Sequence, residues 1–137
     1  MNKQINLKWN SNMEFTAYVD ELTITLDTSP KFGGKNKGVL PKPLLMVSLA
    51  GCTAMDVISI LNKMKTDLTY FNVIVDGELA DEHPMIYKKL HIIYEFSGNN
   101  LNLANIEKAV NLSITKYCGV YATLIKAVEI THEIKII

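Results

Sequence analysis

One apolar run constrains this sequence more than any other feature. The side chains from Leu44 to Leu61 are hydrophobic on almost all sides. The few polar members, Ser48, Asp56 and Ser59, fall on one narrow stripe at helical spacing. We therefore predict a single helix from Leu44 to about Lys65. A helix that is apolar nearly all round must be covered on most sides, and one small sheet cannot do that. The run consequently predicts a second subunit.

The same run is long enough to raise the question of a membrane. Asp56 lies near its middle, and a charged side chain at the centre of a bilayer costs about 2.5–3.5 kcal/mol even on insertion scales. We interpret the run as a buried helix of a protein that does not enter a membrane. The N-terminus lacks the apolar stretch of about 7–15 residues that marks a secretory signal. We therefore expect a cytoplasmic protein with reduced thiols.

Alternating hydrophobic residues predict β-strands on both sides of this helix. The first 27 residues alternate with a period of two and are interrupted by short turns, the first at residues 10–12, which predicts three antiparallel strands. After the helix we predict two strands, two helical segments and a final strand, at residues 69–79, 85–96, 103–112, 114–126 and 128–136. Asn102 and Ser113 are the predicted N-caps of the two helical segments. The order βββ-α-ββ-αα-β predicts an α+β fold with largely antiparallel pairing, in a single domain covering residues 1–137.

Residues 28–43 carry three of the seven glycines and three of the four prolines, which is typical of a loop. Within it, Phe32–Lys35 is glycine-rich and basic but matches neither a Walker motif nor a dinucleotide fingerprint, so we expect a flexible surface loop. Fourteen acidic residues balance fourteen basic ones. This balance removes the general electrostatic argument for binding nucleic acid or an anionic membrane.

Cys52 and Cys118 are the residues of this sequence best suited to take part in a reaction. Two cysteines are too few for a disulfide scaffold or a structural zinc site, and no group of His, Cys, Asp and Glu has a metal-site spacing, so we expect neither metal nor cofactor. Free cysteines are mostly small buried hydrophobes, which is one interpretation of both. The other is a redox pair, formed if the two predicted helices pack and bring the thiols within disulfide reach. Asp56, one turn after Cys52, disfavours ionisation of that thiol unless it is paired or turned away.

Two segments of the chain resemble a known protein family. MVSLAGCTAMDVISILNKMK, around Cys52, resembles the first cysteine helix of the OsmC/Ohr family. VNLSITKYCGVYATLIKAVEITHEIKII, around Cys118, resembles its second cysteine helix and final strand. The patterns GC-x-A-x-DV and KYC-x-V are closest to the YhfA-like branch. The cysteine separation, the strand order and the length also agree, so the resemblance covers nearly the whole chain.

The resemblance implies an intertwined homodimer in which the sheets of both chains wrap two central cysteine-bearing helices, with active sites at the interface. It also implies an antioxidant activity, the thiol-dependent reduction of organic hydroperoxides under oxidative stress. On that pattern Cys52 is the catalytic, peroxidatic thiol and Cys118 the resolving one. The sulfenic acid of Cys52 condenses with Cys118 to a disulfide, which an external dithiol of lipoyl type reduces.

The chain departs from the family at an arginine and a glutamate. Peroxidase members hold the reactive thiolate with an arginine that a glutamate orients, and this chain has no arginine. The glutamate positions, nine and ten residues before Cys52, are Pro43 and Lys42. A lysine supplies positive charge as a point donor, without the bidentate fork of arginine. The candidates in the preceding loop are Lys31, Lys35, Lys37 and Lys42.

Three functional hypotheses remain open, of which one is a purely structural dimer without catalysis or ligand binding. The first is a thiol peroxidase, in which apolar neighbours of Cys52 (Leu45, Leu49, Met55 and Ile58) favour an organic peroxide over hydrogen peroxide. The second is a non-catalytic, stress-associated protein of the same fold, which keeps both thiols and binds a small hydrophobic ligand at the dimer interface. The missing arginine and glutamate favour the second hypothesis.

Overall fold

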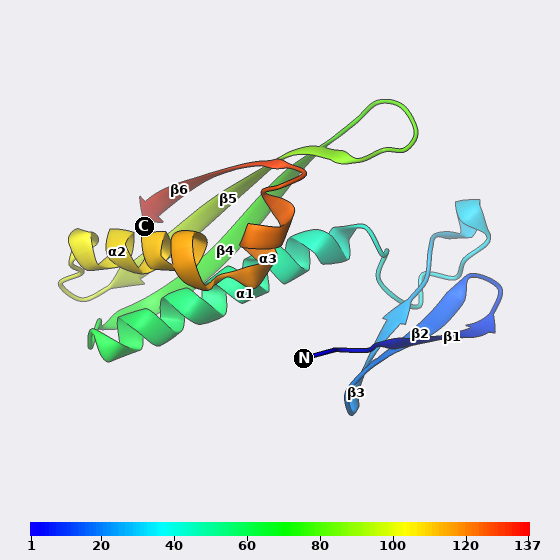
Figure 1. Ribbon diagram of the computed structural model, residues 1–137, viewed down its shortest axis with the longest axis horizontal. Coiled ribbons are helices and arrows are strands. Elements are labelled where there is room, and N and C mark those ends of the chain that lie inside the picture. Colours follow the sequence, from blue (N-terminus) through cyan, green and yellow to red (C-terminus); the bar gives the residue numbers. More distant parts are fainter. The chain divides into compact units, whose positions relative to one another are not determined.

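The structure, a computed structural model, describes all 137 residues and forms two compact units, Met1–Leu45 and Met46–Ile137. The first unit holds the three predicted strands as one antiparallel sheet (Figure 1): β1 (Asn6–Ser11), β2 (Glu14–Val19) and β3 (Leu22–Leu26). Strand β1 continues through Ser11, so the first turn lies at residues 12 and 13. Asn12 takes a left-handed φ of 49° there, a conformation that asparagine tolerates better than most residues.

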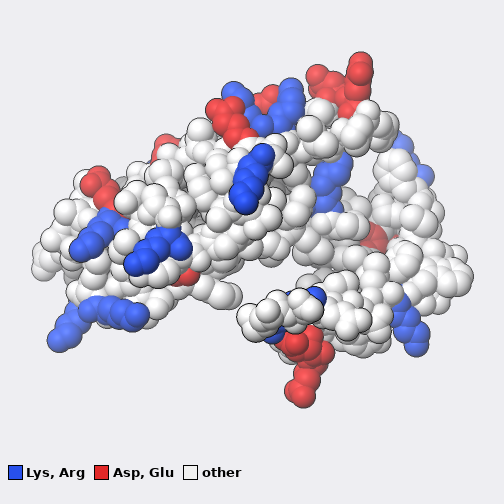
Figure 2. Space-filling view, in the orientation of Figure 1, with Lys and Arg blue, Asp and Glu red and all other residues white.

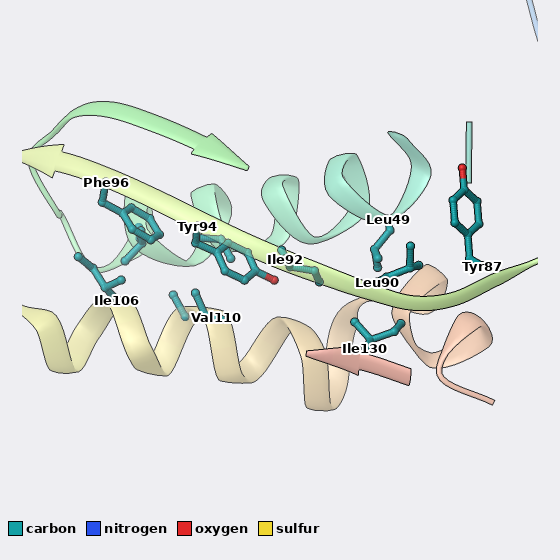
Figure 3. Close-up of a cluster of buried hydrophobic side chains, with 12 residues drawn as sticks. Leu49, Tyr87, Leu90, Ile92, Tyr94, Phe96, Ile106, Val110 and Ile130 are labelled. Atoms are coloured by element: carbon teal, nitrogen blue, oxygen red, sulfur yellow. The ribbon is translucent and has the colours of Figure 1, made fainter. Parts of the chain in front are cut away.

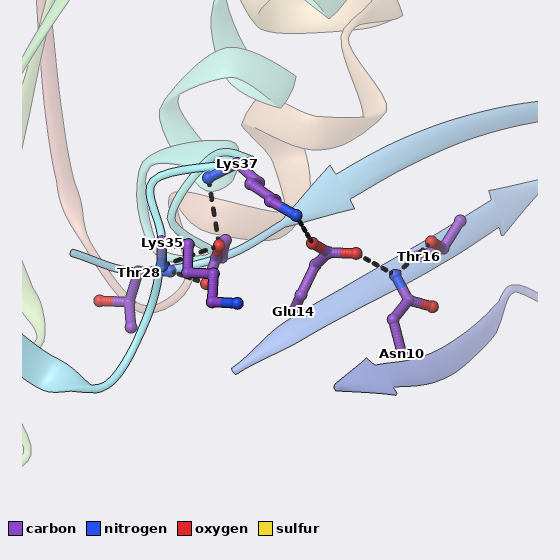
Figure 4. Close-up of polar contacts among 7 residues, drawn as sticks. Asn10, Glu14, Thr16, Thr28, Lys35 and Lys37 are labelled. Carbon is purple, nitrogen blue, oxygen red and sulfur yellow. Dashed lines mark hydrogen bonds and ion pairs between the residues drawn. The ribbon is translucent and has the colours of Figure 1, made fainter. Parts of the chain in front are cut away.

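The loop after β3 is held in place by the buried side chain of Asp27. Its carboxylate accepts backbone N–H groups from Thr28, Lys35 and Lys37 at 2.7, 3.2 and 3.1 Å (Figure 4). Burial raises the pKa of Asp27, but these N–H groups and the charge of Lys37 outweigh it and hold the pKa below its usual value. Gly34 lies so close to the Thr28 carbonyl that a Cβ would collide with it. The loop, which includes the short 3₁₀ helix η1 (Pro30–Phe32), is therefore anchored rather than unconstrained.

The second unit contains a three-stranded sheet in the order β4-β5-β6. Strands β4 (Leu68–Leu79) and β5 (Tyr87–Gly98) pair antiparallel, as predicted. Strand β6 (Glu129–Ile136) pairs parallel with β5, which the sequence did not indicate. A parallel pair needs a long crossover connection, and the helical segment between β5 and β6 supplies it.

One face of this sheet carries the core. The long helix α1 (Pro43–Lys63) and the shorter α2 (Leu103–Leu112) cover that face together (Figures 1 and 3). Alternate residues of β5 point toward the helices because side chains alternate across a strand. The buried hydrophobic residues are Leu49, Val57, Leu61, Tyr87, Leu90, Ile92, Tyr94, Phe96, Ile106, Ala109, Val110 and Ile130.

The opposite face of the sheet is polar. It carries ion pairs between neighbouring strands, among them Lys88 with Glu78 at 3.0 Å and Lys89 with Glu129 at 3.7 Å. Acidic and basic side chains are intermixed on the surface that Figure 2 draws. No broad field of one sign appears there, in keeping with the zero net charge.

The helical segment between β5 and β6 breaks at a different residue from the one predicted. Asn102 caps α2 as expected, since its side chain accepts the N–H of Asn105. Ser113 is the C-cap of α2 and not the predicted N-cap: its backbone is helical, and the chain continues through the π-helical turn η2 (Ser113–Tyr117). The break comes at Cys118, whose backbone is extended, and Cys118 caps the short helix α3 (Gly119–Leu124).

Within one chain, α1 is covered along a single stripe. Its fully buried residues, Leu49, Thr53, Val57 and Leu61, recur every four positions. Other apolar side chains of α1 are open to solvent, among them Val47 and Met55, which are 61% and 76% exposed. By length and composition α1 is also the one helix that could cross a membrane, a test that core helices of soluble proteins pass as well. Asp56 in its middle and its packing on the sheet fit a core helix.

Candidate functional site

The two cysteines, 66 residues apart in sequence, meet where α1 passes the start of α3. Cys52 is half-buried and Cys118 is only 3% exposed, and both are free thiols. The two sulfur atoms and a carboxyl oxygen of Asp56 all lie within 4.8 Å of one another. A disulfide needs a sulfur–sulfur distance of about 2.05 Å, so the reduced pair must still close to form one. The structure therefore brings together both residues that the sequence singled out.

The environment of Cys118 keeps this thiol protonated. Burial is the main cause that raises its pKa to about 11, and the nearby Cys52 and Asp56 raise it further. The backbone N–H of Tyr121 donates to its sulfur at 3.3 Å and opposes that shift without cancelling it. Cys118 is consequently a poor nucleophile at neutral pH until something removes its proton.

Asp56 is not turned away from the thiols, and it ends a chain of buried hydroxyl groups. Ser113 donates a hydrogen bond to Asp56 Oδ2 at 2.9 Å. Thr53 lies 2.9 Å from Ser113, and Tyr94 lies 2.7 Å from Thr53, oxygen to oxygen. None of these three hydroxyl-bearing side chains is exposed. Sequence reasoning missed all three, because they come from η2, α1 and β5 and share no local pattern.

A cavity of about 440 Å³ opens beside Asp56. Its walls combine apolar side chains with two lysines, and the residues are Asp56, Ser59, Ile60, Lys63, Met64, Lys108, Leu112 and Tyr117. Two of the apolar neighbours predicted from the sequence point elsewhere: Leu49 is buried in the core and Met55 is 76% exposed. The apolar lining comes instead from the end of α1 and from the α2–η2 segment.

The structure adds two lysines, Lys63 and Lys108, to the candidates for the positive charge that would replace the family arginine. Among the loop lysines, Lys37 pairs with Glu14 at 3.9 Å, and the Lys31 ammonium lies 5.5 Å from the centre of the Phe32 ring. Lys63 and Lys108 line the same cavity as Asp56. The spacing of Lys63 along the polar stripe of α1 could have drawn attention to it, whereas nothing local marks Lys108.

Cys52, Asp56 and Cys118 are also the one group of three potential metal ligands whose ligand atoms lie within 4.8 Å of one another. Structural zinc sites use four protein ligands, and the usual catalytic zinc sites use histidine among three. This group has three members and no histidine. The group therefore matches neither of these kinds of zinc site.

The family described as OsmC-like protein matches residues 34–133, which include both cysteines and Asp56. The chain belongs to the OsmC-like protein family. Protein YhfA of Escherichia coli K12 is 36% identical over 106 residues, which are 76% of this chain and 79% of YhfA. The predicted family, including the likeness to YhfA, is thereby confirmed.

Solved structures extend the likeness to the whole chain. A hypothetical protein from Aquifex aeolicus VF5 superposes with a TM-score of 0.82 at 29% identity, covering 100% of this chain and 98% of that one. An organic hydroperoxide resistance protein OsmC from Legionella pneumophila superposes with a TM-score of 0.67 at 16% identity, covering 98% and 97%. At that identity the Legionella protein shows the fold alone. The α+β OsmC-like fold predicted from the sequence is confirmed.

Proposed function

We propose that this OsmC-like protein reduces organic hydroperoxides with Cys52 as the peroxidatic thiol and Cys118 as the resolving thiol. The observation that carries the proposal is a half-exposed thiol and a buried thiol whose sulfur atoms lie within 4.8 Å. A substrate can reach the first, while the second is protected until the first is oxidised. The name of the Legionella relative, an organic hydroperoxide resistance protein, supports the same activity.

The reaction follows ordinary thiol chemistry. The thiolate of Cys52 attacks the terminal peroxide oxygen, the O–O bond breaks, and an alcohol leaves with a sulfenic acid on Cys52. Cys118 then displaces the hydroxyl group as water and forms the disulfide. An external dithiol of lipoyl type reduces this disulfide through a mixed disulfide and leaves as its own cyclic disulfide. No bound cofactor enters this cycle.

The cavity beside Asp56 is the proposed peroxide site; neither cysteine lines it, and Asp56, within 4.8 Å of both sulfur atoms, is the residue that connects it to them. Its lining includes Ile60, Met64, Leu112 and Tyr117, and so favours an organic peroxide over hydrogen peroxide. Since the chain has no arginine, a lysine must supply any positive charge that the reactive thiolate needs. Lys63 and Lys108 join the loop lysines as candidates for this role.

We also propose that the working form is an intertwined homodimer of single-domain chains in the cytoplasm. The exposed apolar side chains of α1 support a second subunit, since an apolar helix needs cover on most sides. The Aquifex structure matches residues of both units within one chain, which supports a single domain for residues 1–137. A reducing compartment suits a cycle that begins with two free thiols.

Steady-state turnover tests the activity. Purified protein is supplied with cumene hydroperoxide and dihydrolipoamide, and peroxide loss is followed with wild type, Cys52→Ser and Cys118→Ser. We expect turnover by the wild type, none by Cys52→Ser, and slower turnover by Cys118→Ser, in which the sulfenic acid of Cys52 is removed only by direct attack of the dithiol. Unchanged turnover in Cys52→Ser would exclude the proposed role of that residue.

The cavity and the missing arginine favour one alternative. A site of about 440 Å³ with an apolar lining can hold a small hydrophobic ligand without any redox step. Under this alternative the protein is a non-catalytic, stress-associated binding protein. Cys52→Ser then leaves ligand binding nearly intact, because serine is close to cysteine in size, and peroxide is not consumed by any variant.

A further inference from the structure

The buried hydroxyl chain that ends at Asp56 has a fixed direction. An ionised carboxylate accepts hydrogen bonds and donates none, so the Ser113 hydroxyl donates the hydrogen bond to Asp56. The oxygen of Ser113 must then accept from Thr53, and Thr53 must accept from Tyr94. Burial raises the pKa of Tyr94 to about 12, which keeps the phenol protonated as the first donor. Three buried hydroxyl groups are thus aligned toward one oxygen of one carboxylate.

Asp56 also lies close to both thiols. One carboxyl oxygen lies within 4.8 Å of both sulfur atoms, a separation that a single water molecule can bridge. The thiols around Asp56 are Cys52 on its own helix and Cys118 at the start of α3. The other titratable groups are Tyr94 of β5 with Tyr121 of α3 beyond it, and the cavity residues Tyr117, Lys63 and Lys108. A carboxylate so oriented is in position to take a proton from a neighbouring thiol.

We propose that Asp56 is the general base that activates Cys118, with Ser113, Thr53 and Tyr94 as the positioning residues that orient its carboxylate. The inference rests on the proposed function and adds to it a residue for the resolving step. Asp56 removes the proton of Cys118, and the resulting thiolate attacks the Cys52 sulfur of the sulfenic acid. The sulfur–oxygen bond breaks, Asp56 returns the same proton to the departing hydroxide, and a disulfide and one water result.

The buried state of Cys118 explains why a base is needed. With a pKa of about 11, only about one molecule in ten thousand carries the Cys118 thiolate at pH 7. An attack that waited for this fraction would be slow, and sulfenic acid left waiting is open to further, irreversible oxidation. A carboxylate within 4.8 Å of both sulfur atoms, acting as a base, shortens that interval.

The test separates Cys118 activation from peroxide chemistry. Reduced protein is mixed with one equivalent of the aromatic disulfide DTNB, and release of the coloured thiolate is followed in a stopped-flow instrument. The first phase reports attack by the accessible Cys52. The second phase reports attack by Cys118 on the mixed disulfide at Cys52, and Cys118→Ser, which lacks this phase, assigns it. We compare wild type with Asp56→Asn, which keeps an acceptor for Ser113, and with Glu107→Gln, an exposed charge change on α2.

We expect Asp56→Asn to slow the second phase at least tenfold at pH 7, while the first phase stays as fast as in the wild type or becomes faster, because a carboxylate close to Cys52 disfavours its thiolate. In this variant the rate of the second phase should rise about tenfold per pH unit from pH 7 to 9, because Cys118 then ionises without a base. In wild type and Glu107→Gln the rate of the second phase should change little over the same range. Ser113→Ala should slow the second phase less and keep the flat profile, and it carries the test if Asp56→Asn does not fold. A second phase in Asp56→Asn with the rate and pH profile of the wild type would overturn the proposal.

A parallel run with one equivalent of cumene hydroperoxide keeps the two proposals apart. If the wild type forms no sulfenic acid, the peroxidase function fails, while the DTNB phases still decide the role of Asp56. If sulfenic acid forms in both proteins but persists longer in Asp56→Asn than in the wild type, whatever its rate of formation, the result supports Asp56 as the base of the resolving step. Equal lifetimes of the sulfenic acid in both proteins would overturn it.

Discussion

At the scale of single residues, burial separates two thiols that look alike in the sequence. Cys52 and Cys118 each lie in a helical segment next to a glycine, and both fit the description of an ordinary buried cysteine. In the fold, Cys52 is half-buried, whereas Cys118 is 3% exposed and caps α3 with its sulfur. The pair, whose sulfur atoms lie within 4.8 Å, therefore consists of an accessible thiol and a protected one.

This difference predicts selective alkylation. At pH 7, iodoacetamide should modify Cys52 while Cys118 stays unmodified, because Cys118 is buried and its pKa is about 11. Peptide mass spectrometry over time gives the two rates, and protein unfolded in urea provides the control in which both residues react alike. Equal rates in the folded protein would contradict the assignment.

The cysteine pair could be predicted from residue types and the family resemblance, but its polar support could not. Thr53 lies 60 residues from Ser113 and 41 residues from Tyr94 in the sequence, and the three come from different elements. Nothing in their local sequence distinguishes them from surface polar residues. Only the fold shows that they are buried together and aligned toward Asp56.

At the scale of elements, alternation and helical spacing located nearly every strand and helix. They did not predict how β6 pairs, because periodicity indicates which residues face the core but not the direction of a neighbouring strand. The break at Cys118 was placed five residues early, at Ser113, since serine is a common N-cap. The loop at residues 28–43 was predicted, but its anchoring was not, because the anchor, Asp27, lies outside that range, directly after β3.

Replacing Asp27 with asparagine should loosen this loop. Asp27→Asn removes one of two acceptor oxygens that hold the N–H groups of Thr28, Lys35 and Lys37. We expect a lower melting temperature at pH 7 and faster hydrogen exchange of the Lys35 and Lys37 amides. Glu21→Gln, an exposed change of the same charge, serves as the control.

The effect of Asp27→Asn should depend on pH in a defined direction. The pKa of Asp27 is depressed in the folded protein, so its contribution is present above the unfolded pKa of about 4 and is lost as the pH falls through the folded value. The melting temperatures of wild type and variant should therefore converge in acid. A difference that stays constant from pH 7 to pH 2 would contradict this account of the loop.

At the scale of the whole molecule, a single chain leaves part of the apolar surface of α1 uncovered. A second apolar groove of about 350 Å³ runs along it, lined by Val47, Ala50, Gly51 and Ala54 of α1 and by Phe71, Asn72 and Val73 of β4. Small residues in this groove allow close approach of another surface. The apolar run from Leu44 to Leu61 predicted such an uncovered face from the sequence alone.

We therefore expect a dimer with no stable monomer at micromolar concentration. Val47→Glu should shift sedimentation toward the monomer and lower the melting temperature, because Val47 is 61% exposed in one chain and a charge in an apolar interface is costly. Leu103→Glu, at an exposed apolar position of α2, is the matched control. A well-folded wild-type monomer by sedimentation equilibrium would refute the expectation.

The central claim is that Cys52 and Cys118 form one redox centre. The most direct test is to add one equivalent of cumene hydroperoxide to the reduced wild-type protein without any reductant and to measure the intact mass and the peptide map. The account predicts rapid loss of two hydrogen atoms and a single cross-linked peptide pair that joins Cys52 to Cys118. Protein that keeps both thiols, or that carries an oxidised Cys52 without any cross-link to Cys118, would contradict it.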